Sequence, residues 1–266
     1  MSPSSSDAPL LSIVVPTYNE TARIPARVQE IRDFIDRQEY PAELLVVDDG
    51  SGDGTPDLVD RLADGHRGIR TIRNDHRGKA YTVRTGMLAA TGQYVLFTDA
   101  DQSTPIEETN NVLPYLQDGW DVVIGSREIA GARRYNEPAF RHIMGRVFTR
   151  VVQILTGQRF QDTQCGFKAF SHAAAQDIFS RVQLYGANSR VLKVPKVTGF
   201  DVELLFIARK RGWRIREVPV HWYYSAGSKV SSVRDSYQNF LDVVKVRLYD
   251  LQGKYDAGSD TREAGR

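Results

Sequence analysis

Features that define several other protein classes are scarce in this chain of 266 residues. It contains one cysteine, Cys165, so no disulfide can form within the chain, which is typical of a reducing compartment. No apolar run approaches the roughly 18 residues needed to cross a bilayer, and residues 1–7 lack the basic and apolar regions of a signal peptide. The formal net charge is only +2, which gives no overall reason for nucleic-acid binding. We therefore expect no nucleic-acid partner and no membrane-spanning segment.

The remaining composition is that of a globular protein with a buried core. Hydrophobic residues make up 41% of the chain and charged residues 26%, which suits one large α/β domain of this length. We expect residues 1–9 to be disordered, 10–232 to form one domain, 233–252 to form a C-terminal amphipathic helix, and 253–266 to be a disordered tail.

Short β-branched runs alternate with helical patterns along the chain. Strands are expected at 11–16, 44–47, 70–73, 94–98 and 122–125, and helices at 22–37, 55–63, 79–90, 138–155, 202–211 and 234–251. This alternation predicts an α/β fold with a mainly parallel, Rossmann-like sheet flanked by helices. In such sheets ligands bind beyond the carboxyl ends of the strands, and polar clusters follow four of the expected strands at that end.

One of these clusters holds two aspartates separated by one residue, Asp99-Ala100-Asp101, directly after an apolar strand. Carboxylate oxygens suit Mg²⁺ or Mn²⁺, which in turn bind a substrate diphosphate. The alternative is that the two aspartates only cap the following helix. Their place at the mouth of the sheet, beside a second acidic pair, favours metal binding by Asp99 and Asp101.

The second acidic pair, Asp48 and Asp49, begins a turn-rich loop after another strand. A phosphate-binding glycine loop would be basic or neutral, whereas this loop is acidic. Its carboxylates suit hydrogen bonds from a nucleobase imide or from ribose hydroxyls, and simple turn formation is the alternative.

Two basic side chains are expected near the same edge of the sheet. Lys79 and Arg127 could bind a diphosphate, Arg127 through two parallel hydrogen bonds, although an arginine after a strand is often only solvated.

The order and spacing of these motifs resemble the family 2 inverting glycosyltransferases, which have the GT-A fold. The matching segments are 13–20 (IVVPTYNE), 46–51 (VVDDGS), 78–80 (GKA), 99–101 (DAD) and 125–127 (GSR). Further segments narrow the resemblance to the dolichyl-phosphate β-glucosyltransferase branch, with polyprenyl-phosphate mannosyltransferases as neighbours: 162–170 (DTQCGFKAF), 199–203 (GFDVE), 217–220 (EVPV) and 227–230 (GSKV). The resemblance covers about residues 10–232.

This resemblance implies a role for particular residues. The residues that match nucleoside contacts are Pro16, Tyr18, Glu20 and Asp49. Asp99 and Asp101 match the site of the metal and diphosphate, Arg127 a contact to a donor or acceptor phosphate, and Lys229 a phosphate-binding lysine.

Two positions depart from the mannosyltransferase pattern. Ser103 stands where those enzymes have a glutamine, and Tyr223 where they have an arginine. Both departures favour the glucosyl branch, with UDP-glucose as donor and a polyprenyl phosphate as acceptor.

The expected helix at 138–155 is amphipathic, and it interleaves Arg141, Arg146 and Arg150 with apolar residues. Such a helix can lie in the headgroup region of an anionic membrane. An ordinary helix packed on the core has the same pattern, and the family resemblance favours the membrane surface. The helix at 234–251 could join it. We expect a cytoplasmic protein, peripheral at the inner face of the plasma membrane.

The acceptor decides whether the reaction needs a base. A lipid phosphate is already anionic and needs none, whereas a hydroxyl acceptor requires a carboxylate within hydrogen-bond reach. Asp162 and Asp201 are the candidates. Asp201 could instead only stabilise the N-terminus of its helix, where a negative charge is favourable. Cys165 is interpreted as a small buried residue, and His221 as a half-buried strand residue.

Three alternatives remain open. The first is the same fold with GDP-mannose or a soluble hydroxyl acceptor. The second is a sugar-nucleotide-binding protein without transferase activity, which intact Asp99, Asp101, Arg127 and Lys229 disfavour. The third is a nucleotidyltransferase, which would have a basic glycine-rich loop after the first strand, where this chain has residues 17–20 (TYNE).

Overall fold

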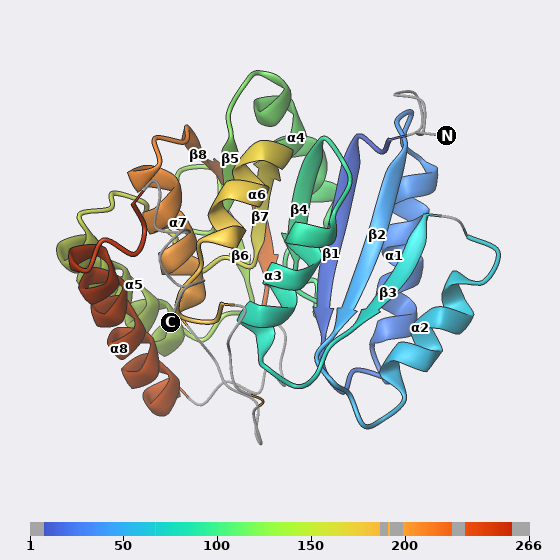
Figure 1. The fold of residues 1–266 in the computed structure, drawn as a ribbon, viewed down its shortest axis with the longest axis horizontal. Coiled ribbons are helices and arrows are strands. Elements are labelled where there is room, and N and C mark those ends of the chain that lie inside the picture. The colour runs from blue at the N-terminus through green and yellow to red at the C-terminus, as the bar shows by residue number, and fades with distance from the viewer. Residues whose placement is uncertain (1–7, 67, 187–190, 192–198, 225–231, 257–266) are drawn as a thin grey trace, which may run out of the picture.

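A seven-stranded sheet forms the centre of the molecule, in the order β3-β2-β1-β4-β7-β5-β8 (Figure 1). The computed structural model describes residues 8–66, 68–186, 191, 199–224 and 232–256. The strands are β1 (Leu11–Thr17), β2 (Ala42–Asp48), β3 (Ile69–Arg73), β4 (Tyr94–Thr98), β5 (Val122–Ser126), β6 (Arg133–Tyr135), β7 (Phe167–Ser171), β8 (Ile215–Pro219) and β9 (His221–Tyr223). The helices are α1 (Ile24–Asp36), α2 (Thr55–Ala63), α3 (Lys79–Ala89), η1 (Ile106–Glu108), α4 (Thr109–Gln117), α5 (Ala139–Thr156), α6 (His172–Ser180), α7 (Phe200–Lys210) and α8 (Ser232–Leu251).

The sheet is mainly parallel, which confirms the predicted fold class. Strand β1 lies parallel to β2 and β4, β2 lies parallel to β3, and β5 lies parallel to β8. Strand β7 is the exception, because it runs antiparallel between β4 and β5. Strands β6 and β9 pair separately in a small two-stranded sheet.

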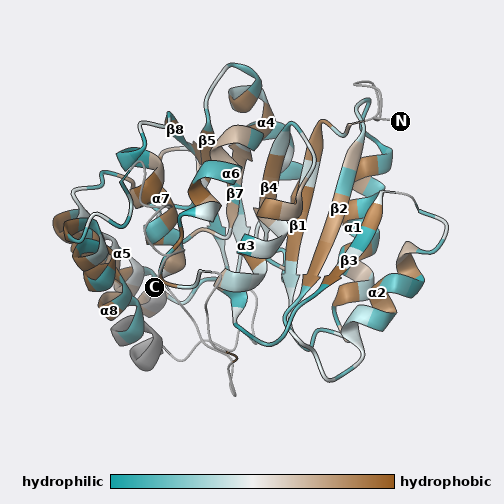
Figure 2. Ribbon diagram, viewed as in Figure 1, coloured by the Kyte–Doolittle hydropathy of each residue, from teal (hydrophilic) through white to brown (hydrophobic). Residues whose placement is uncertain are grey.

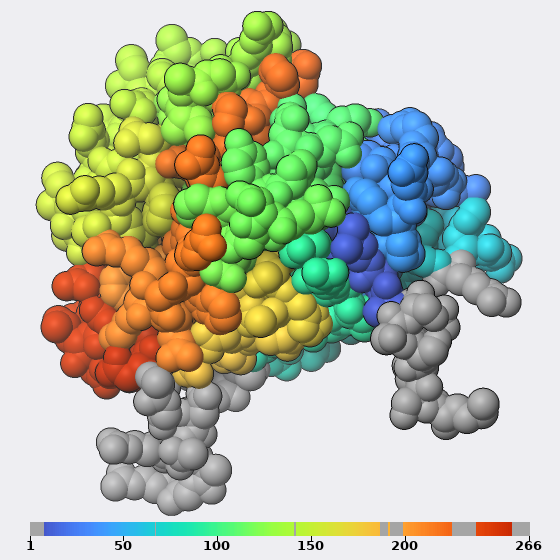
Figure 3. Space-filling view, turned by 90° about the horizontal axis from the view of Figure 1, so that it is seen from above, coloured from blue at the N-terminus to red at the C-terminus, as the bar shows by residue number. Residues whose placement is uncertain are grey.

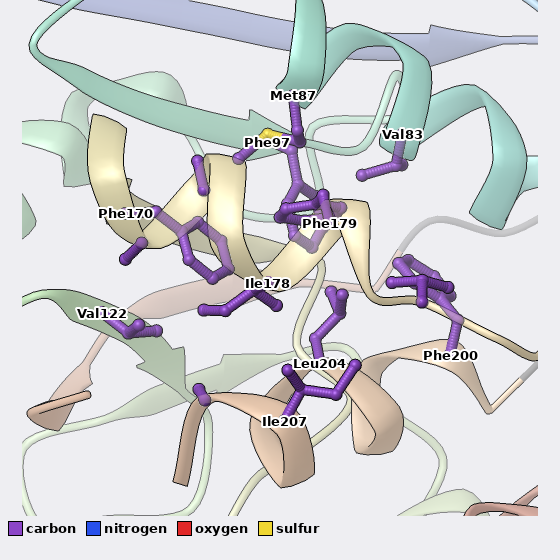
Figure 4. Close-up of a cluster of buried hydrophobic side chains, with 14 of the residues drawn as sticks. Val83, Met87, Phe97, Val122, Phe170, Ile178, Phe179, Phe200, Leu204 and Ile207 are labelled. Carbon is purple, nitrogen blue, oxygen red and sulfur yellow. The ribbon is translucent and has the colours of Figure 1, made fainter. Parts of the chain in front are cut away.

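Helices cover both faces of the sheet, because alternate strand residues point to opposite sides. On one face α3, α6 and α7 pack on β4 and β7, and Met87, Phe97, Phe170, Phe179 and Leu204 form the centre of this cluster (Figure 4). On the other face α1, α2 and α4 cover the strand residues that point to that side, such as Ile13, Val15 and Leu96. Figure 2 shows the strands as the most hydrophobic part of the fold, as expected for strands buried on both faces.

Several elements of the chain were given no bounds in the prediction from sequence. These are strands β6, β7 and β8 and helices η1, α4 and α6, whereas β9 agrees with the expected strand position of His221. The elements that were predicted agree with the structure to within about two residues at each end, which is the usual uncertainty of element boundaries.

Both ends of the described chain contact the domain. The Tyr255 side chain is fully buried, and its hydroxyl donates a 2.7 Å hydrogen bond to Glu203 Oε1. At the other end the backbone carbonyl of Pro9 accepts a hydrogen bond from the Gln93 N–H. The predicted domain boundaries stay predictions.

Helices α5 and α8 pack against each other at the end of the molecule opposite β3 and α2 (Figures 1 and 3). Among the residues described, no helix combines the length and the hydropathy that a membrane span requires.

Candidate functional site

The carboxyl ends of β1, β2 and β4 lie together at one edge of the sheet (Figure 1). Register places Thr17 of β1 beside Asp48 of β2, and Val14 of β1 beside Phe97 of β4. The polar segments that follow these strands therefore meet at this edge, as the sequence analysis predicted. The region formed by residues 17–20, 48–55, 76–79 and 99–103 is called the donor side below.

The acidic pair of β2 organises the donor side through hydrogen bonds within the chain. Asp48 accepts bonds from the Ser51 N–H (2.8 Å) and the Ser51 hydroxyl (2.5 Å). Asp49 accepts bonds from the Arg77 N–H (2.8 Å) and from the Gly78 N–H (3.0 and 2.9 Å), and it contacts His76 Nδ1 at 2.8 Å. Both carboxylates are buried, so they fix the loops before α2 and α3 in place. Their predicted contact with a nucleobase stays a prediction.

Residues next to this pair complete the donor side. Tyr18 stacks on His76 with ring centroids 4.2 Å apart. The backbone N–H of Glu20 donates to the Thr55 hydroxyl at 2.9 Å, which ties the end of β1 to the start of α2. Pro16 lies buried inside β1, so it shapes the strand end without facing solvent. His76 was not predicted as a site residue, because a single histidine in a turn-rich loop carries no sequence signal of its own.

Asp99 and Asp101 follow β4 at the centre of the same edge, with Ala100 buried between them. Asp101 Oδ1 accepts a bond from the Ser103 N–H at 3.0 Å. Asp99 Oδ1 lies 2.5 Å from Lys79 Nζ, and these two side chains are 32% and 42% exposed. Burial lowers the pKa of Lys79, but the carboxylates of Asp99, Asp201 and Asp101 outweigh burial and raise it. The structure thus brings Lys79 together with three of the predicted carboxylates.

Asp201 lies at the start of α7 and forms an ion pair that the sequence analysis missed. Its Oδ1 lies 2.6 Å from Lys168 Nζ, which also donates to the Cys165 carbonyl. Lys168 is completely buried in β7. A buried lysine requires a partner of opposite charge, and Asp201 supplies it. The available signal was a lysine flanked by apolar residues within 167–170, but without a predicted strand there the sequence did not place it in the core.

Arg127 follows β5 and is bound by Asp162 through three hydrogen bonds. Arg127 Nε and Nη2 donate to Asp162 Oδ2 (2.6 Å) and Oδ1 (2.9 Å), and the Arg127 backbone N–H donates to Oδ2 (3.0 Å). Arg127 also lies over the Trp222 ring, 5.3 Å from its centroid. Burial opposes ionisation of Asp162, but the Arg127 guanidinium dominates and holds the pKa of that carboxyl far below its usual range. A carboxylate of such low pKa is a poor base. The candidate role of Asp162 as a base for a hydroxyl acceptor stays a prediction.

A half-buried carboxylate, Glu217, supports this pair. It accepts hydrogen bonds from the backbone N–H groups of Gln161 (3.0 Å) and Asp162 (2.8 Å). Burial raises the pKa of Glu217, although these hydrogen bonds lower it in part. Glu217 therefore fixes the segment that carries Asp162, and its place on β8 explains why it was missed, since β8 was not predicted.

Two residues have the structural roles expected from the sequence. Cys165 is completely buried, and burial raises the pKa of its thiol to about 11, which makes it a poor nucleophile. His221 lies half-buried on β9, and its Nδ1 contacts Glu108 at 2.7 Å. The predicted phosphate-binding Lys229 lies outside the described residues.

The donor side fits a divalent cation in part. Among the described residues, no three histidine, cysteine, aspartate or glutamate side chains converge as a metal site. Asp99 Oδ1 is nevertheless a buried oxygen that accepts no well-directed hydrogen bond from the described chain. Mg²⁺ is usually held by one or two carboxylates together with substrate phosphate oxygens. Asp99 and Asp101 therefore fit as the protein's share of a metal site that a diphosphate completes.

The opposite end of the molecule has a different surface, which we call the α5/α8 face. Its exposed apolar residues are Phe140, Ile143, Val147 and Ile154 on α5 and Phe240, Leu248 and Leu251 on α8. Arg150 is exposed on this face, whereas Arg146 forms an ion pair with Glu128 at 3.4 Å. The side chain of Arg141 lies outside the described part of the chain. The predicted contribution of Arg141, Arg146 and Arg150 to membrane binding stays a prediction.

Comparison with known proteins identifies the relatives of this chain. Residues 12–179 match the family model for glycosyl transferase family 2. A dolichyl-phosphate beta-glucosyltransferase of Dictyostelium discoideum is 31% identical over 261 residues, covering 91% of this chain and 75% of that protein.

Solved structures share the fold at lower sequence identity. The mannosyltransferase PcManGT from Pyrobaculum calidifontis, in complex with GDP-Man and Mn²⁺, superposes with a TM-score of 0.58 at 23% identity, covering 91% of this chain and 65% of that one. Glucosyl-3-phosphoglycerate synthase from Mycobacterium tuberculosis, in complex with Mn²⁺, UDP and glucosyl-3-phosphoglycerate, gives 0.59 at 19% identity and covers 90% and 79% of the two chains.

Proposed function

Because the chain belongs to glycosyl transferase family 2, we propose that it transfers glucose from UDP-glucose to a polyprenyl phosphate at a membrane surface, assisted by Mg²⁺ or Mn²⁺. Its relatives named dolichyl-phosphate beta-glucosyltransferase support both the sugar and the class of acceptor. The two departures from the mannosyltransferase pattern, Ser103 and Tyr223, support the same donor.

The donor side supplies the groups that such a donor requires. A nucleoside would lie against the loops that Asp48 and Asp49 hold in place, beside the Tyr18 and His76 stack. Its diphosphate would lie at the sheet edge, within reach of Lys79. A divalent cation held by Asp99 and Asp101 would neutralise the charge that develops on the departing diphosphate.

One observation is the main support for a phosphate acceptor. Both candidate carboxylates for a base already form ion pairs with basic side chains. Asp162 binds Arg127, and Asp201 binds the buried Lys168. A hydroxyl acceptor would need a free carboxylate, whereas a phosphate monoester is anionic at neutral pH. An oxygen of the acceptor phosphate forms the bond to the anomeric carbon while the bond from that carbon to the diphosphate breaks and UDP departs. The protein then contributes positioning and charge stabilisation.

Arg127 is suited to hold one of the two phosphates. Its hydrogen bonds to Asp162 use Nε, Nη2 and the backbone N–H, which leaves Nη1 for a ligand. Asp162 and Trp222 fix the guanidinium plane, so little side-chain entropy is lost when a phosphate binds. Lys229 would add a second positive charge, as the family resemblance implies.

The α5/α8 face is suited to the membrane that carries a lipid acceptor. Its exposed apolar residues can enter the headgroup region, and Arg150 can interact with anionic lipid. This arrangement supports a peripheral membrane protein. Its location in the cytoplasm, at the inner face of the plasma membrane, is part of the proposal.

The direct test is to incubate the purified protein with polyprenyl phosphate, Mn²⁺ and a panel of radiolabelled nucleotide-sugars, and to extract the lipid into an organic phase. We expect label from UDP-glucose in that phase, and none with Asp101→Ala. If label enters the organic phase only from GDP-mannose, mannose would replace glucose as the proposed sugar. Label that enters only a water-soluble hydroxyl acceptor would overturn the proposed acceptor.

A further inference from the structure

Two lysine–aspartate pairs meet at the sheet edge, and they differ in exposure. Lys168 and Asp201 are 0% and 10% exposed, whereas Lys79 and Asp99 are 42% and 32% exposed. A buried pair cannot exchange partners without leaving a charge unpaired in the core. A partly exposed pair can exchange one partner for water or a ligand without leaving a charge unpaired in the core. Only the Lys79–Asp99 pair can therefore open at low cost.

Within that pair, the lysine side chain is the part that can move. The backbone before Lys79 is fixed, because Asp49 accepts two hydrogen bonds from the Gly78 N–H and Gly78 has a φ of 94°. The four-carbon stem of Lys79 remains flexible and half-exposed. Asp99, by contrast, packs so closely on Gly166 that a Cβ at residue 166 would lie 2.2 Å from Asp99 Oδ2. The carboxylate therefore keeps its place when the lysine leaves.

Lys79 and a bound divalent cation would compete for the carboxylate of Asp99. Lys79 Nζ lies 2.5 Å from Asp99 Oδ1, and a divalent ion coordinated by Asp99 would stand within a few ångströms of that ammonium group. The two like charges would repel each other strongly at this distance. A diphosphate brings negative oxygens to the same edge, and these can take over Lys79 while they also coordinate the metal.

We propose that Lys79 is the exchangeable counter-ion of Asp99, which occupies Asp99 in the nucleotide-free protein and moves to the diphosphate when the donor binds. The metal and the nucleotide then bind cooperatively. The diphosphate draws Lys79 away from Asp99, where its charge would repel the metal, and the metal in turn releases Lys79 to the diphosphate. By linkage the effect is reciprocal: UDP raises the affinity for Mn²⁺ by the same factor as Mn²⁺ raises the affinity for UDP. This inference rests on the proposed metal-assisted function and adds to it a coupling between metal binding and nucleotide binding.

The test measures Mn²⁺ binding directly, through the electron paramagnetic resonance signal of free Mn²⁺, with and without UDP. The wild-type protein should bind Mn²⁺ weakly alone and about tenfold or more tightly with UDP. Lys79→Met should bind Mn²⁺ about tenfold more tightly than wild type without UDP, and UDP should enhance its Mn²⁺ binding much less. Lys79→Arg keeps the charge and should retain the coupling.

Two further variants serve as controls. Asp99→Ala should lose Mn²⁺ binding, which identifies the site. Lys210→Met removes a lysine from another aspartate pair, with Asp250 at 2.5 Å, and should behave as wild type. Circular dichroism melts would show that each variant is folded.

The outcomes separate the inference from the function on which it rests. If UDP enhances Mn²⁺ binding equally in wild type and Lys79→Met, or if Lys79→Met binds Mn²⁺ no more tightly than wild type without UDP, the exchange is refuted and metal-assisted transfer stands. If no variant binds Mn²⁺ even with UDP, both the metal site and the exchange are wrong.

Discussion

The donor side and the α5/α8 face use their residues in opposite ways. On the donor side the carboxylates of Asp48 and Asp49 are buried and accept hydrogen bonds from backbone N–H groups, so the loops are fixed before any ligand arrives. On the α5/α8 face large apolar side chains such as Ile154 and Leu251 remain 81% and 77% exposed. A preorganised polar site suits a small ligand of defined shape, whereas an exposed apolar face suits a fluid surface such as a membrane.

Buried ion pairs lie between these two regions and join them. Lys168 of β7 connects to Asp201 of α7, and Arg127 after β5 connects to Asp162. Helix α7 packs in turn on α8. Helices α7 and α8 are thereby held in a fixed position relative to the end of β4, which carries the proposed metal site.

The largest expected effect comes from Asp101→Ala on the donor side. Its carboxylate accepts one hydrogen bond from a nearby backbone N–H, at Ser103, so the fold should remain intact. Loss of a charged metal ligand should lower the transfer rate by at least about 10²-fold and should weaken Mn²⁺-dependent binding of UDP-glucose. Calorimetry of UDP-glucose binding with and without Mn²⁺ would check this. An unchanged affinity and metal dependence would show that Asp101 is not a metal ligand.

The strands of the central sheet differ in how well the sequence predicted them. On the donor side the strands are short apolar runs that end in conspicuous polar motifs, so both the parallel sheet and the cluster of Lys79, Asp99 and Asp101 could be predicted. The antiparallel strand β7 could not be predicted. Its residues, 167–171 (FKAFS), follow a loop and include a lysine, which usually indicates a solvent-exposed position. Its burial depends on Asp201, which lies 33 residues later in the chain.

The surroundings of Asp162 could not be predicted for a related reason. Asp162 was a candidate base only for a hydroxyl acceptor, and a residue's chemistry depends on its neighbours in space. The pairing with Arg127 lies 35 residues back along the chain and cannot be read from local sequence.

A second large effect should follow from breaking the ion pair that joins the two regions. Asp201→Asn leaves Lys168 buried and charged without a charged partner, which should lower the free energy of unfolding by about 3–5 kcal/mol. Chemical denaturation would measure the loss. If the acceptor is a lipid phosphate, the folded fraction should still transfer glucose, because no base is removed.

Lys229→Ala provides the contrast on the same acceptor. It should lose much more transfer activity than Asp201→Asn, since it removes a positive charge expected beside a phosphate. A well-folded but inactive Asp201→Asn next to an active Lys229→Ala would instead favour a hydroxyl acceptor and a base at Asp201, where loss of the base costs about 10²–10⁴ in rate.

A third, smaller effect concerns the core beneath α7 and α8. Burial raises the pKa of Glu203 to about 7, even though Tyr255 and the backbone N–H groups of Gln183 and Leu184 donate to it and lower it in part. Its ordinary pKa is near 4.5. Between these values the folded protein holds a proton that the unfolded chain has lost, so stability falls as the pH rises from about 4.5 to about 7.

Glu203→Gln should remove this pH dependence, because glutamine resembles the protonated acid and can still accept from the two backbone N–H groups. Relative to wild type the variant should gain on the order of 3 kcal/mol between pH 4.5 and pH 8. Denaturation at both pH values would measure the difference. A constant difference across this range would mean that Glu203 is ionised throughout in the folded protein.

The smallest effect is expected from a single charge on the α5/α8 face, and it isolates this face from the rest of the protein. Arg150→Gln should weaken binding to anionic vesicles about fivefold at low salt, because one basic residue near such a surface contributes about 1 kcal/mol. Arg61→Gln is the matched control, since Arg61 is likewise an exposed helical arginine but lies on α2 at the opposite end of the molecule. Neither substitution should change the free energy of unfolding by more than about 0.5 kcal/mol. Vesicle co-sedimentation across a salt series would measure the difference, which should vanish as added salt screens the surface potential. Equal vesicle binding by the two variants would mean that α5 does not face the membrane, and the exposed apolar residues of this face would then need another partner.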